Sequence, residues 1–373
     1  MSEAWSRQDT SYPAGGSQGR TITIELPDNV VAPSHPPQPS DAWDLQLREL
    51  GGHLLQSWRW GAFKQRHGWN AHRLLVNDPA GSAMAQVLYR FRGPVSLGYI
   101  PRGPALAGEA GILWPRLLTE IDASGRSNRA ITTIVEPDRP LGLAGTLREA
   151  GVVRGPEHLQ PGRTVKVPIA DDDEMLRQMH QKTRYNVRLA QRRGVVIERS
   201  QGDDRGIDAF YALMQDTAER NAFGIHSLDY YQDFLRVFAD DAVMLFARVD
   251  AGELGAVLIA ARFGKEAIYM YGASSTRHRA HGAAFLLQFE AMRWARELGC
   301  DTYDLWGIPD QDPESVSSDS KGAIAGTRGD DWRGLYRFKT GFGGEVVSYP
   351  TMLERRHVPV LPWLARKLNV IKG

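Results

Sequence analysis

The sequence has a single cysteine, Cys300, so it cannot form an internal disulfide bond, and a reducing cytosolic compartment is expected. No uninterrupted apolar run is long enough to cross a bilayer. The first twenty residues also lack the apolar core that a signal peptide needs. The formal net charge is only +1, so the protein as a whole has no positive electrostatic field that would attract nucleic acid. Any basic site must therefore be local.

The composition describes a globular protein with a core. Hydrophobic residues make up 42% of the 373 residues and charged residues 24%, and this length suffices for two ordinary domains. Four prolines in the segment VAPSHPPQPS end a polar N-terminal stretch. We therefore predict a flexible tail over residues 1–40, with order beginning near Asp41. A short docked strand at RTITIEL is the less favoured alternative.

Strand patterns recur in the same order in the two halves of the chain. The first half reads HRLLVN, AMAQVLYRF, VSLGYIPRG, a helix over about 109–124, and AITTIV. The second half reads VMLFARVD, LGAVLIAARF, EAIYMYGAS, a helix over about 282–298, and TYDLWGI. The offset stays close to that between Tyr99 and Tyr271, which lie 172 positions apart. We predict two copies of one α/β unit, over residues 41–165 and 166–345, rather than a chance alignment of strands.

This order of elements resembles the acyltransferase fold of the GNAT superfamily. In that fold a central strand splays from its neighbour, and the acyl donor lies in the gap. Residues 279–284 (RAHGAA) fit the R-x-x-G-x-[GA] loop by which GNAT acetyltransferases hold the coenzyme A pyrophosphate. Small residues before a helix N-terminus are suited to binding an anion. A glycine-containing loop that only leads into a buried helix would have the same sequence pattern. Both interpretations stay open.

A second basic feature is a helix with the sequence EMLRQMHQKTRYNVRLAQRRG. Arg184, Arg188 and Arg192 recur every four residues and form a stripe that is either a solvated face or a set of phosphate contacts. His278 and His281 lie three residues apart, but no third convincing ligand accompanies them. We therefore predict no metal site.

Six segments together resemble the Fem family (FemABX), the aminoacyltransferases that build peptidoglycan cross-bridges. They follow that family's order and span about residues 54–346: QSWRWGAFKQRHGW, YIPRGP, KTRYNVRLAQRRGV, YMYGAS, YDLWGI and GLYRFKTGFGG. The resemblance implies an α/β (α+β) fold of two tandem GNAT-like domains, with mixed sheets flanked by helices. This agrees with the duplication found in the strand pattern.

The resemblance also implies substrates and roles. The acceptor is a UDP-MurNAc-peptide or lipid II, and aminoacyl-tRNA is the co-substrate, with no other cofactor. Lys64 and Arg184 match positions that hold the acceptor's diphosphate, Tyr269 and Tyr271 match aromatic residues of the peptide channel, and Lys339 matches a lysine beside the reacting ester. The remaining substrate-binding residues that we expect are Tyr99, Arg102, Arg188, Asp304 and Phe338.

Lys339 is the candidate catalytic residue. An amine that attacks an ester must be neutral and oriented, and the developing oxyanion needs a positive group nearby. The glycines that follow Lys339 predict a close approach of the backbone to substrate. The alternative for Lys339, as for Lys64, is a solvated surface lysine.

The chain departs from the family at one motif: many relatives carry an acidic residue after YIPRGP, where this chain offers only Glu109. The polar segment 309–334, which precedes Lys339, is predicted to be a lid.

Two other functions compete with this hypothesis. One is an acetyl-CoA-dependent GNAT-type N-acyltransferase, which would bind coenzyme A and ignore ribonuclease. The other is a non-catalytic anion-binding protein.

Residues 346–373 form an extension that either returns to the first domain or lies with its basic, tryptophan-bearing helix on the anionic inner membrane surface. We expect a cytoplasmic protein, peripheral at the inner face of the plasma membrane in the second case.

Overall fold

The structure is a computed structural model that describes residues 39–143, 145–155, 159–200, 204–221, 224–310 and 332–358. These described residues belong to one compact unit. The predicted N-terminal tail, most of the predicted lid and the predicted membrane-binding helix lie outside the described residues. They stay predictions.

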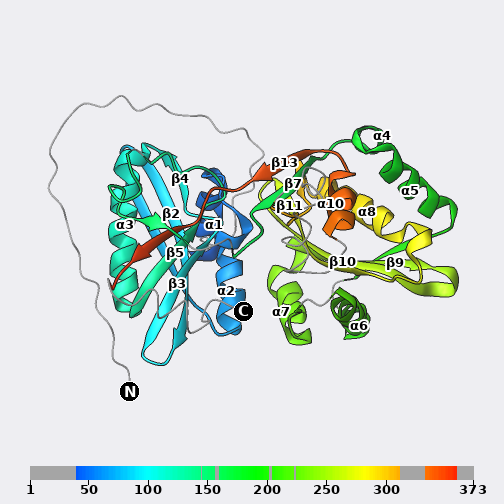
Figure 1. Ribbon diagram of the computed structural model, residues 1–373, viewed down its shortest axis with the longest axis horizontal. Coiled ribbons are helices and arrows are strands. Elements are labelled where there is room, and N and C mark those ends of the chain that lie inside the picture. The colour runs from blue at the N-terminus through cyan, green and yellow to red at the C-terminus, as the bar shows by residue number, and fades with distance from the viewer. Residues whose placement is uncertain are drawn as a thin grey trace, which may run out of the picture. The chain divides into compact units, whose positions relative to one another are not determined.

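The first sheet contains most of the strands of the N-terminal half. Its strands are β1 (Asn70–Asp78), β2 (Gly81–Arg92), β3 (Val95–Pro101), β4 (Ala105–Gly108), β5 (Ala130–Glu136), β6 (Val153–Arg154) and β14 (Leu353–Arg356). They are ordered β1-β2-β3-β5-β14-β6, with β4 beside β2. Helix α3 (Ala110–Ser127) packs along one face and supplies Leu113, Leu117 and Ile121 to the core (Figure 1). The elements α1 (Pro39–Glu49), η1 (Leu54–Gln56) and α2 (Trp58–Arg66) precede the sheet in the chain.

The second sheet is covered by helices on both faces. Its strands are β7 (Arg163–Pro168), β8 (Val196–Ser200), β9 (Ala242–Val249), β10 (Glu253–Phe263), β11 (Glu266–Ser274), β12 (Thr302–Asp304) and β13 (Glu345–Ser348). They are ordered β13-β7-β12-β11-β10-β9-β8. One face carries α8 (Ala283–Glu297), α5 (Gln181–Arg192) and α10 (Trp332–Thr340), and the other carries α6 (Asp204–Asn221) and α7 (Leu228–Phe238) (Figure 1). The remaining elements are α4 (Asp172–Gln178), η2 (Ala239–Asp241), η3 (Asp250–Gly252) and η4 (Arg279–His281).

The two sheets repeat one pairing pattern. Strands β1, β2, β3 and β5 pair antiparallel, antiparallel and parallel, and β9, β10, β11 and β12 do the same. The repeated elements keep the offset seen in the sequence, since β2 begins at Gly81 and β10 at Glu253. The tandem GNAT-like fold class is therefore confirmed. The exact domain limits at residues 165 and 345 remain a prediction.

The parallel strand pair differs between the two sheets. Strands β3 and β5 pair from Ser96 to Pro101, along the whole of β3 except its first residue. Strands β11 and β12 pair only over three positions, and the last pair joins Ile268 to Asp304. Beyond that pair β11 continues to Ser274 without β12. The splayed strand that marks the acyl-donor position in a GNAT-like fold is thus found in the second sheet.

A β-bulge in β11 corrects one sequence expectation. Tyr271 lies opposite Ile259 and Tyr269 opposite Ala260, so Met270 is the extra residue. Because side chains alternate along a strand, one extra residue turns the two tyrosines to opposite faces. Tyr269 packs with the α8 side and Tyr271 with the α7 side. The family resemblance implied that both tyrosines line one peptide channel, whereas the structure places their rings on opposite faces of the sheet.

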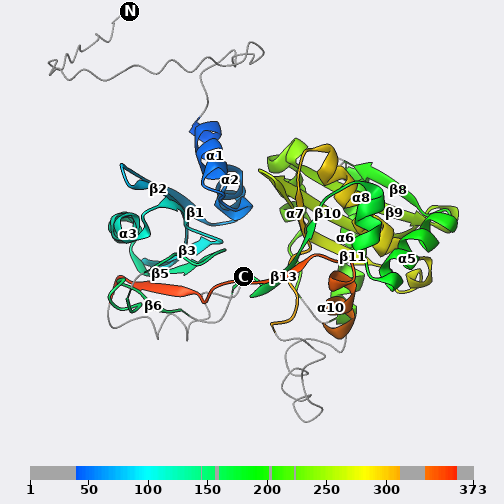
Figure 2. The ribbon, with the colours of Figure 1, turned by 90° about the horizontal axis from the view of Figure 1, so that it is seen from above.

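The described end of the chain joins the first sheet. Strand β14, the red arrow between β5 and β6 in Figure 2, pairs antiparallel with both of them. Leu353 lies opposite Val135. Arg355 forms a two-pronged ion pair with Asp122 of α3, with nitrogen–oxygen distances of 2.8 and 2.5 Å. Of the two predicted places for the C-terminal extension, residues 353–356 occupy the first domain.

Candidate functional site

Lys339 lies where β11 and β12 part. Its side chain is buried, and Nζ donates a hydrogen bond to the Gly307 carbonyl at 2.8 Å. The same Nζ lies 5.4 Å from the centre of the Tyr269 ring. Burial lowers the pKa of Lys339 from its ordinary 10.5 to about 7, although the Asp304 carboxylate opposes this shift. A lysine that changes charge near neutral pH suits acid–base work better than a solvated surface lysine does.

Asp304 holds the turn that presents this carbonyl. Its carboxylate accepts hydrogen bonds from the Trp306 backbone N–H at 2.6 Å, from the Tyr349 hydroxyl at 3.3 Å and from Thr164. Trp306 has a φ of 59°, a left-handed conformation that is strained for a non-glycine residue. We expected Asp304 to bind substrate. Because both of its oxygens contact protein donors, we assign it instead to positioning Gly307 and hence Lys339.

The glycines after Lys339 approach protein rather than substrate. A Cβ on Gly341 would lie 2.3 Å from the Thr183 hydroxyl, and one on Gly344 would lie 2.3 Å from the Lys166 carbonyl. The expectation that they open the backbone to substrate is therefore wrong. They dock the end of α10 on the start of α5 and on β7. Phe338 points into the same core and contacts the rings of Phe285 and Phe342.

Arg102 joins the first sheet to this turn. Its guanidinium stacks 3.5 Å from the centre of the Tyr349 ring and 5.5 Å from that of Trp306, and Nη2 donates to the Pro161 carbonyl at 2.6 Å. Its Nε and Nη1 atoms have no hydrogen-bond partner among the described residues, and the same holds for Nε2 of buried His53. The His53 ring lies 6.0 Å from that of Trp306. Unused donors thus border the turn from the first sheet.

Tyr99 lies in a buried network of the first sheet. Its hydroxyl donates to Glu136, and Gln160 donates to that hydroxyl at 3.3 Å. Burial and the Glu136 carboxylate raise the pKa of Tyr99 well above its ordinary value, so it stays neutral. Trp69 packs against Tyr99 in one apolar cluster. Tyr99 therefore supports Trp69 within the first sheet.

Lys64 lies in a cage of aromatic rings. Its Nζ is 5.3–5.9 Å from the ring centres of Trp60, Phe63, Trp69 and Tyr230, and 3.4 Å from the Tyr230 hydroxyl. Burial, followed by the nearby Arg90 guanidinium, lowers the pKa of Lys64 to about 8. No carboxylate pairs with Lys64 within the described part of the chain. A desolvated, unpaired cation of this kind favours an anion.

Arg90 of β2 is the second cation of this site, and the sequence did not reveal it. Its guanidinium lies 5.3 Å from the centre of the Trp69 ring, whose other neighbour is Lys64 at 5.5 Å. Within the described ranges Arg90 has neither a hydrogen-bond nor an ion-pair partner. Two unpaired cations on one indole repel each other unless an anion lies between them. No local pattern could have marked Arg90, because its partner stands on the preceding helix.

Aromatic rings from α7, from the segment before it and from β11 extend the Lys64 site toward the second sheet. His226 stacks on Tyr230 with ring centres 3.8 Å apart, and the Tyr271 ring lies 6.4 Å from that of Tyr230. Burial, with a further effect of the Lys64 charge, lowers the pKa of His226 to about 4, so it is neutral at physiological pH. The cage is therefore a neutral, apolar wall around a small positive centre.

Arg184 does not share this site, contrary to our expectation of one cleft with Lys64. Its Nη1 donates to the carbonyls of Leu176, Arg177 and Met179, each at 3.2 Å, and so caps the C-terminus of α4. Helix α5 packs on the α8 side of the second sheet, whereas Lys64 contacts α7 on the other side. The four-residue spacing did not reveal that Arg184 turns inward while Arg188 is exposed.

The loop that resembled a coenzyme A cradle is filled by protein. Gly282 has a φ of 72°, and a Cβ there would lie 2.7 Å from the Asn186 carbonyl of α5. Arg193, also of the α5 segment, donates to the Ala280 carbonyl. The small residues thus let α5 approach the loop, which gives Gly282 a packing role within the protein. This observation counts against the acetyl-CoA hypothesis.

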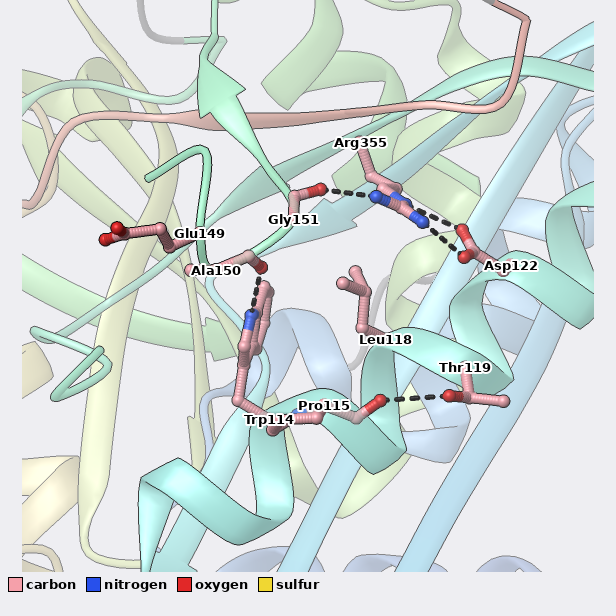
Figure 3. Close-up of a pocket in the computed structure, with 9 residues that line it drawn as sticks. All are labelled: Trp114, Pro115, Leu118, Thr119, Asp122, Glu149, Ala150, Gly151 and Arg355. Atoms are coloured by element: carbon pink, nitrogen blue, oxygen red, sulfur yellow. Dashed lines mark hydrogen bonds and ion pairs between the residues drawn. The ribbon is translucent and has the colours of Figure 1, made fainter. Parts of the chain in front are cut away.

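A separate hollow lies in the first domain, away from Lys339. It measures about 270 Å³ and is bordered by α3, by residues 149–151 and by Arg355 (Figure 3). The Trp114 indole donates to the Ala150 carbonyl at 2.8 Å, and Arg355 donates to the Gly151 carbonyl at 2.6 Å (Figure 3). None of the predicted site residues lines this hollow, and its donors are already paired. Glu109, the acidic residue after the YIPRGP motif, is exposed just before α3, and its backbone N–H donates to the Ala80 carbonyl of the β1–β2 turn at 2.9 Å.

Comparison with known proteins agrees with the geometry. A family model described as the FemAB family matches residues 157–258 and 253–365, more than half of the chain. The lipid II:glycine glycyltransferase of Staphylococcus aureus is 25% identical over 352 residues, covering 71% of this chain and 82% of the relative.

Solved structures support the fold. The crystal structure of FemX superposes with a TM-score of 0.72 at 21% identity, over 88% of this chain and 98% of FemX. The structure of L-PGS from Bacillus licheniformis superposes with a TM-score of 0.52 at 16% identity, over 90% of this chain and 98% of L-PGS. No described helix has the length and apolar character that crossing a membrane requires. The family match, the tandem fold and the matching segments place this chain in the FemAB family.

Proposed function

We propose that the chain transfers an amino acid from an aminoacyl-tRNA to an amine of the stem peptide of a peptidoglycan precursor, a UDP-MurNAc-peptide or lipid II. As a member of its family the chain is an aminoacyltransferase. The observation that carries the proposal is the position of Lys339 Nζ at the end of the β11–β12 pairing. The name of the glycyltransferase relative supports the class of acceptor.

The chemistry follows from the protonation of Lys339. A neutral amine of the acceptor attacks the ester carbonyl, a C–N bond forms, and the ester C–O bond breaks to release the ribose hydroxyl. With a pKa of about 7, Lys339 is partly cationic at neutral pH. In that form it stabilises the oxyanion and donates a proton toward the leaving oxygen. The proton that the attacking amine loses restores the charge balance.

The acceptor's diphosphate is assigned to Lys64 and Arg90. Two unpaired cations that face one indole match two adjacent phosphates, and arginine can contact both in a forked geometry. This replaces the pairing of Lys64 with Arg184. Burial, followed by the Arg90 charge, lowers the pKa of Lys64, and a bound diphosphate would oppose both effects by favouring the cationic form.

The aminoacyl-tRNA is assigned to the opposite face of the second sheet. Arg188 and Arg192 of α5 are exposed, and neither has an acidic partner among the residues that the structure describes. Tyr185, 55% exposed, lies beside Arg192 at 5.8 Å. Exposed arginines with an aromatic neighbour suit a phosphate backbone. Donor and acceptor then arrive from the two faces and meet where β11 and β12 part.

Purified protein tests the proposal directly. It should transfer labelled amino acid from a charged tRNA pool to UDP-MurNAc-pentapeptide or lipid II, and ribonuclease should abolish transfer. Lys339→Met should lower kcat by about a hundredfold or more while acceptor binding stays within about twofold. Lys265→Met is the matched control, because exposed Lys265 also donates to a backbone carbonyl, that of Gly299. Transfer that is insensitive to ribonuclease, with saturable coenzyme A binding, would support the acetyl-CoA alternative.

A further inference from the structure

Two short turns of the second sheet bring four metal-ligating side chains together. The turn η3 joins β9 to β10 and carries Asp250, with Glu253 three residues later. The turn η4 precedes α8, and it carries His281, with His278 three residues before. In a 3₁₀ turn, side chains three residues apart project on the same side. Each turn therefore presents a pair of ligands, carboxylates from one turn and imidazoles from the other.

The two pairs face each other closely. The His278 Nε2 atom lies 2.7 Å from a Glu253 oxygen, and the His281 Nε2 atom lies 2.8 Å from an Asp250 oxygen. Ligand atoms of Asp250, His278 and His281 all lie within 4.8 Å of one another. His278 is only 8% exposed, which fixes its ring. The sequence had offered no third ligand for the two histidines, because Asp250 stands one strand hairpin earlier in the chain.

We propose that Asp250, His278 and His281 bind a zinc ion, with Glu253 as the fourth ligand. Two imidazole nitrogens with carboxylate oxygens are a donor set that zinc favours, and hard cations such as Mg²⁺ disfavour it. Ligand atoms around tetrahedral zinc lie about 3.4 Å apart. The two hydrogen-bonded pairs, at 2.7 and 2.8 Å, therefore open by roughly 0.6 Å to admit the ion, and the other ligand atoms of Asp250, His278 and His281, which lie within 4.8 Å of one another, close by roughly 1.4 Å at most. The buried Nδ1 atom of His281 has no hydrogen-bond partner among the described residues, so its ring retains a nitrogen free to serve as ligand or donor.

The site would connect the β9–β10 hairpin to the start of α8. It is separate from Lys339, and the proposed aminoacyl transfer does not depend on it. Arg277 is a further cation at this cluster, since its Nη1 lies 3.4 Å from a Glu253 oxygen. Its side chain is 78% exposed, so it can leave when the carboxylate turns to the metal.

Metal binding to the untagged full-length protein tests the proposal. Chelator-treated protein should take up one equivalent of zinc in equilibrium dialysis, and Co²⁺ should give the visible absorption of a tetrahedral site. Asp250→Asn and His281→Ala should each weaken zinc binding by about tenfold or more, whereas the control His180→Ala, at an exposed histidine outside the cluster, should not. Zinc should also raise the midpoint of thermal unfolding of the wild type but not of Asp250→Asn.

The Asp250→Asn variant separates loss of zinc binding from loss of folding. The Asp250 side chain is 65% exposed, so its replacement by asparagine leaves the core intact even where a histidine variant unfolds. The proposal is overturned when the wild type binds less than one equivalent of zinc at micromolar metal, or when Asp250→Asn and His281→Ala bind zinc as tightly as the wild type and the control His180→Ala do. In that case the cluster consists of two histidine–carboxylate pairs only.

Discussion

Replacing Lys339 by methionine should stabilise the protein at neutral pH although it lowers kcat. Methionine keeps the length and apolar volume of the lysine stem and removes the charge. The folded state lowers the pKa of Lys339 from 10.5 to about 7. Between these two pH values the unfolded chain binds a proton that the folded chain does not, so the stability of the wild type falls as the pH falls. Below about pH 7 both states are protonated, and the loss is complete.

The magnitude follows from the shift. Each pKa unit corresponds to 1.36 kcal/mol, so the buried lysine costs on the order of 4 kcal/mol of unfolding free energy at pH 7. The methionine variant also loses the hydrogen bond from Nζ to Gly307, which is worth about 1 kcal/mol. The net gain is then about 3 kcal/mol at pH 7, and it falls to about zero near pH 10.

Urea unfolding of both proteins at half-unit steps from pH 6 to pH 10 measures this difference. Subtracting the unfolding free energies of the two proteins at each pH isolates the contribution of Lys339 from that of the other titrating groups. One of these is Glu266, because burial raises its pKa to about 7. Lys265→Met should follow the wild type throughout. If Lys339→Met is less stable than the wild type at pH 7, or if the difference does not change with pH, the fold accommodates the charge without penalty. The assignment of Lys339 as a group that titrates near neutrality is then wrong.

The remaining predictions concern the two substrates and the discarded cofactor. Lys64→Met and Arg90→Met should each raise the acceptor KM by about tenfold with little change in kcat, and an unchanged KM for Arg90→Met would remove that residue from the site. The double variant Arg188→Glu, Arg192→Glu should raise the KM for aminoacyl-tRNA, flatten its dependence on salt and leave the acceptor KM unchanged. Gly282→Ala should lower stability by about 1 kcal/mol or more because its Cβ meets the α5 backbone, and calorimetry with coenzyme A should show no saturable heat in the wild type.

Periodic patterns predicted the fold well because they are local. The strand order, the two helices at matching offsets and the tandem arrangement follow from alternation along strands and from the repeat of about 172 residues. The bulge at Met270 broke this logic, since one extra residue reverses every later side chain of β11. Nothing in the segment EAIYMYGAS distinguishes a regular strand from a bulged one.

The candidate site was predicted less completely than the fold. Lys64 and Lys339 stand in segments that resemble the family, and the structure buries or half-buries both. Arg184 was misplaced because a helical stripe of arginines does not show which one caps a neighbouring helix. Arg90 and Asp250 were missed because their partners are distant in the chain, and only the folded arrangement brings them together.

The position of β14 has a consequence for how the protein is made. The first sheet receives this strand from a segment in which Glu354 contacts Thr132 across 222 residues of sequence. A nascent chain that has released β1 to β5 still exposes the edge of β5, and it keeps that edge open while the whole second sheet is synthesised. Cutting the gene between the two halves would therefore yield an N-terminal fragment with an unpaired strand. A synthetic peptide of residues 349–358 should bind that fragment and complete it, because the domain translated first depends on a strand translated late.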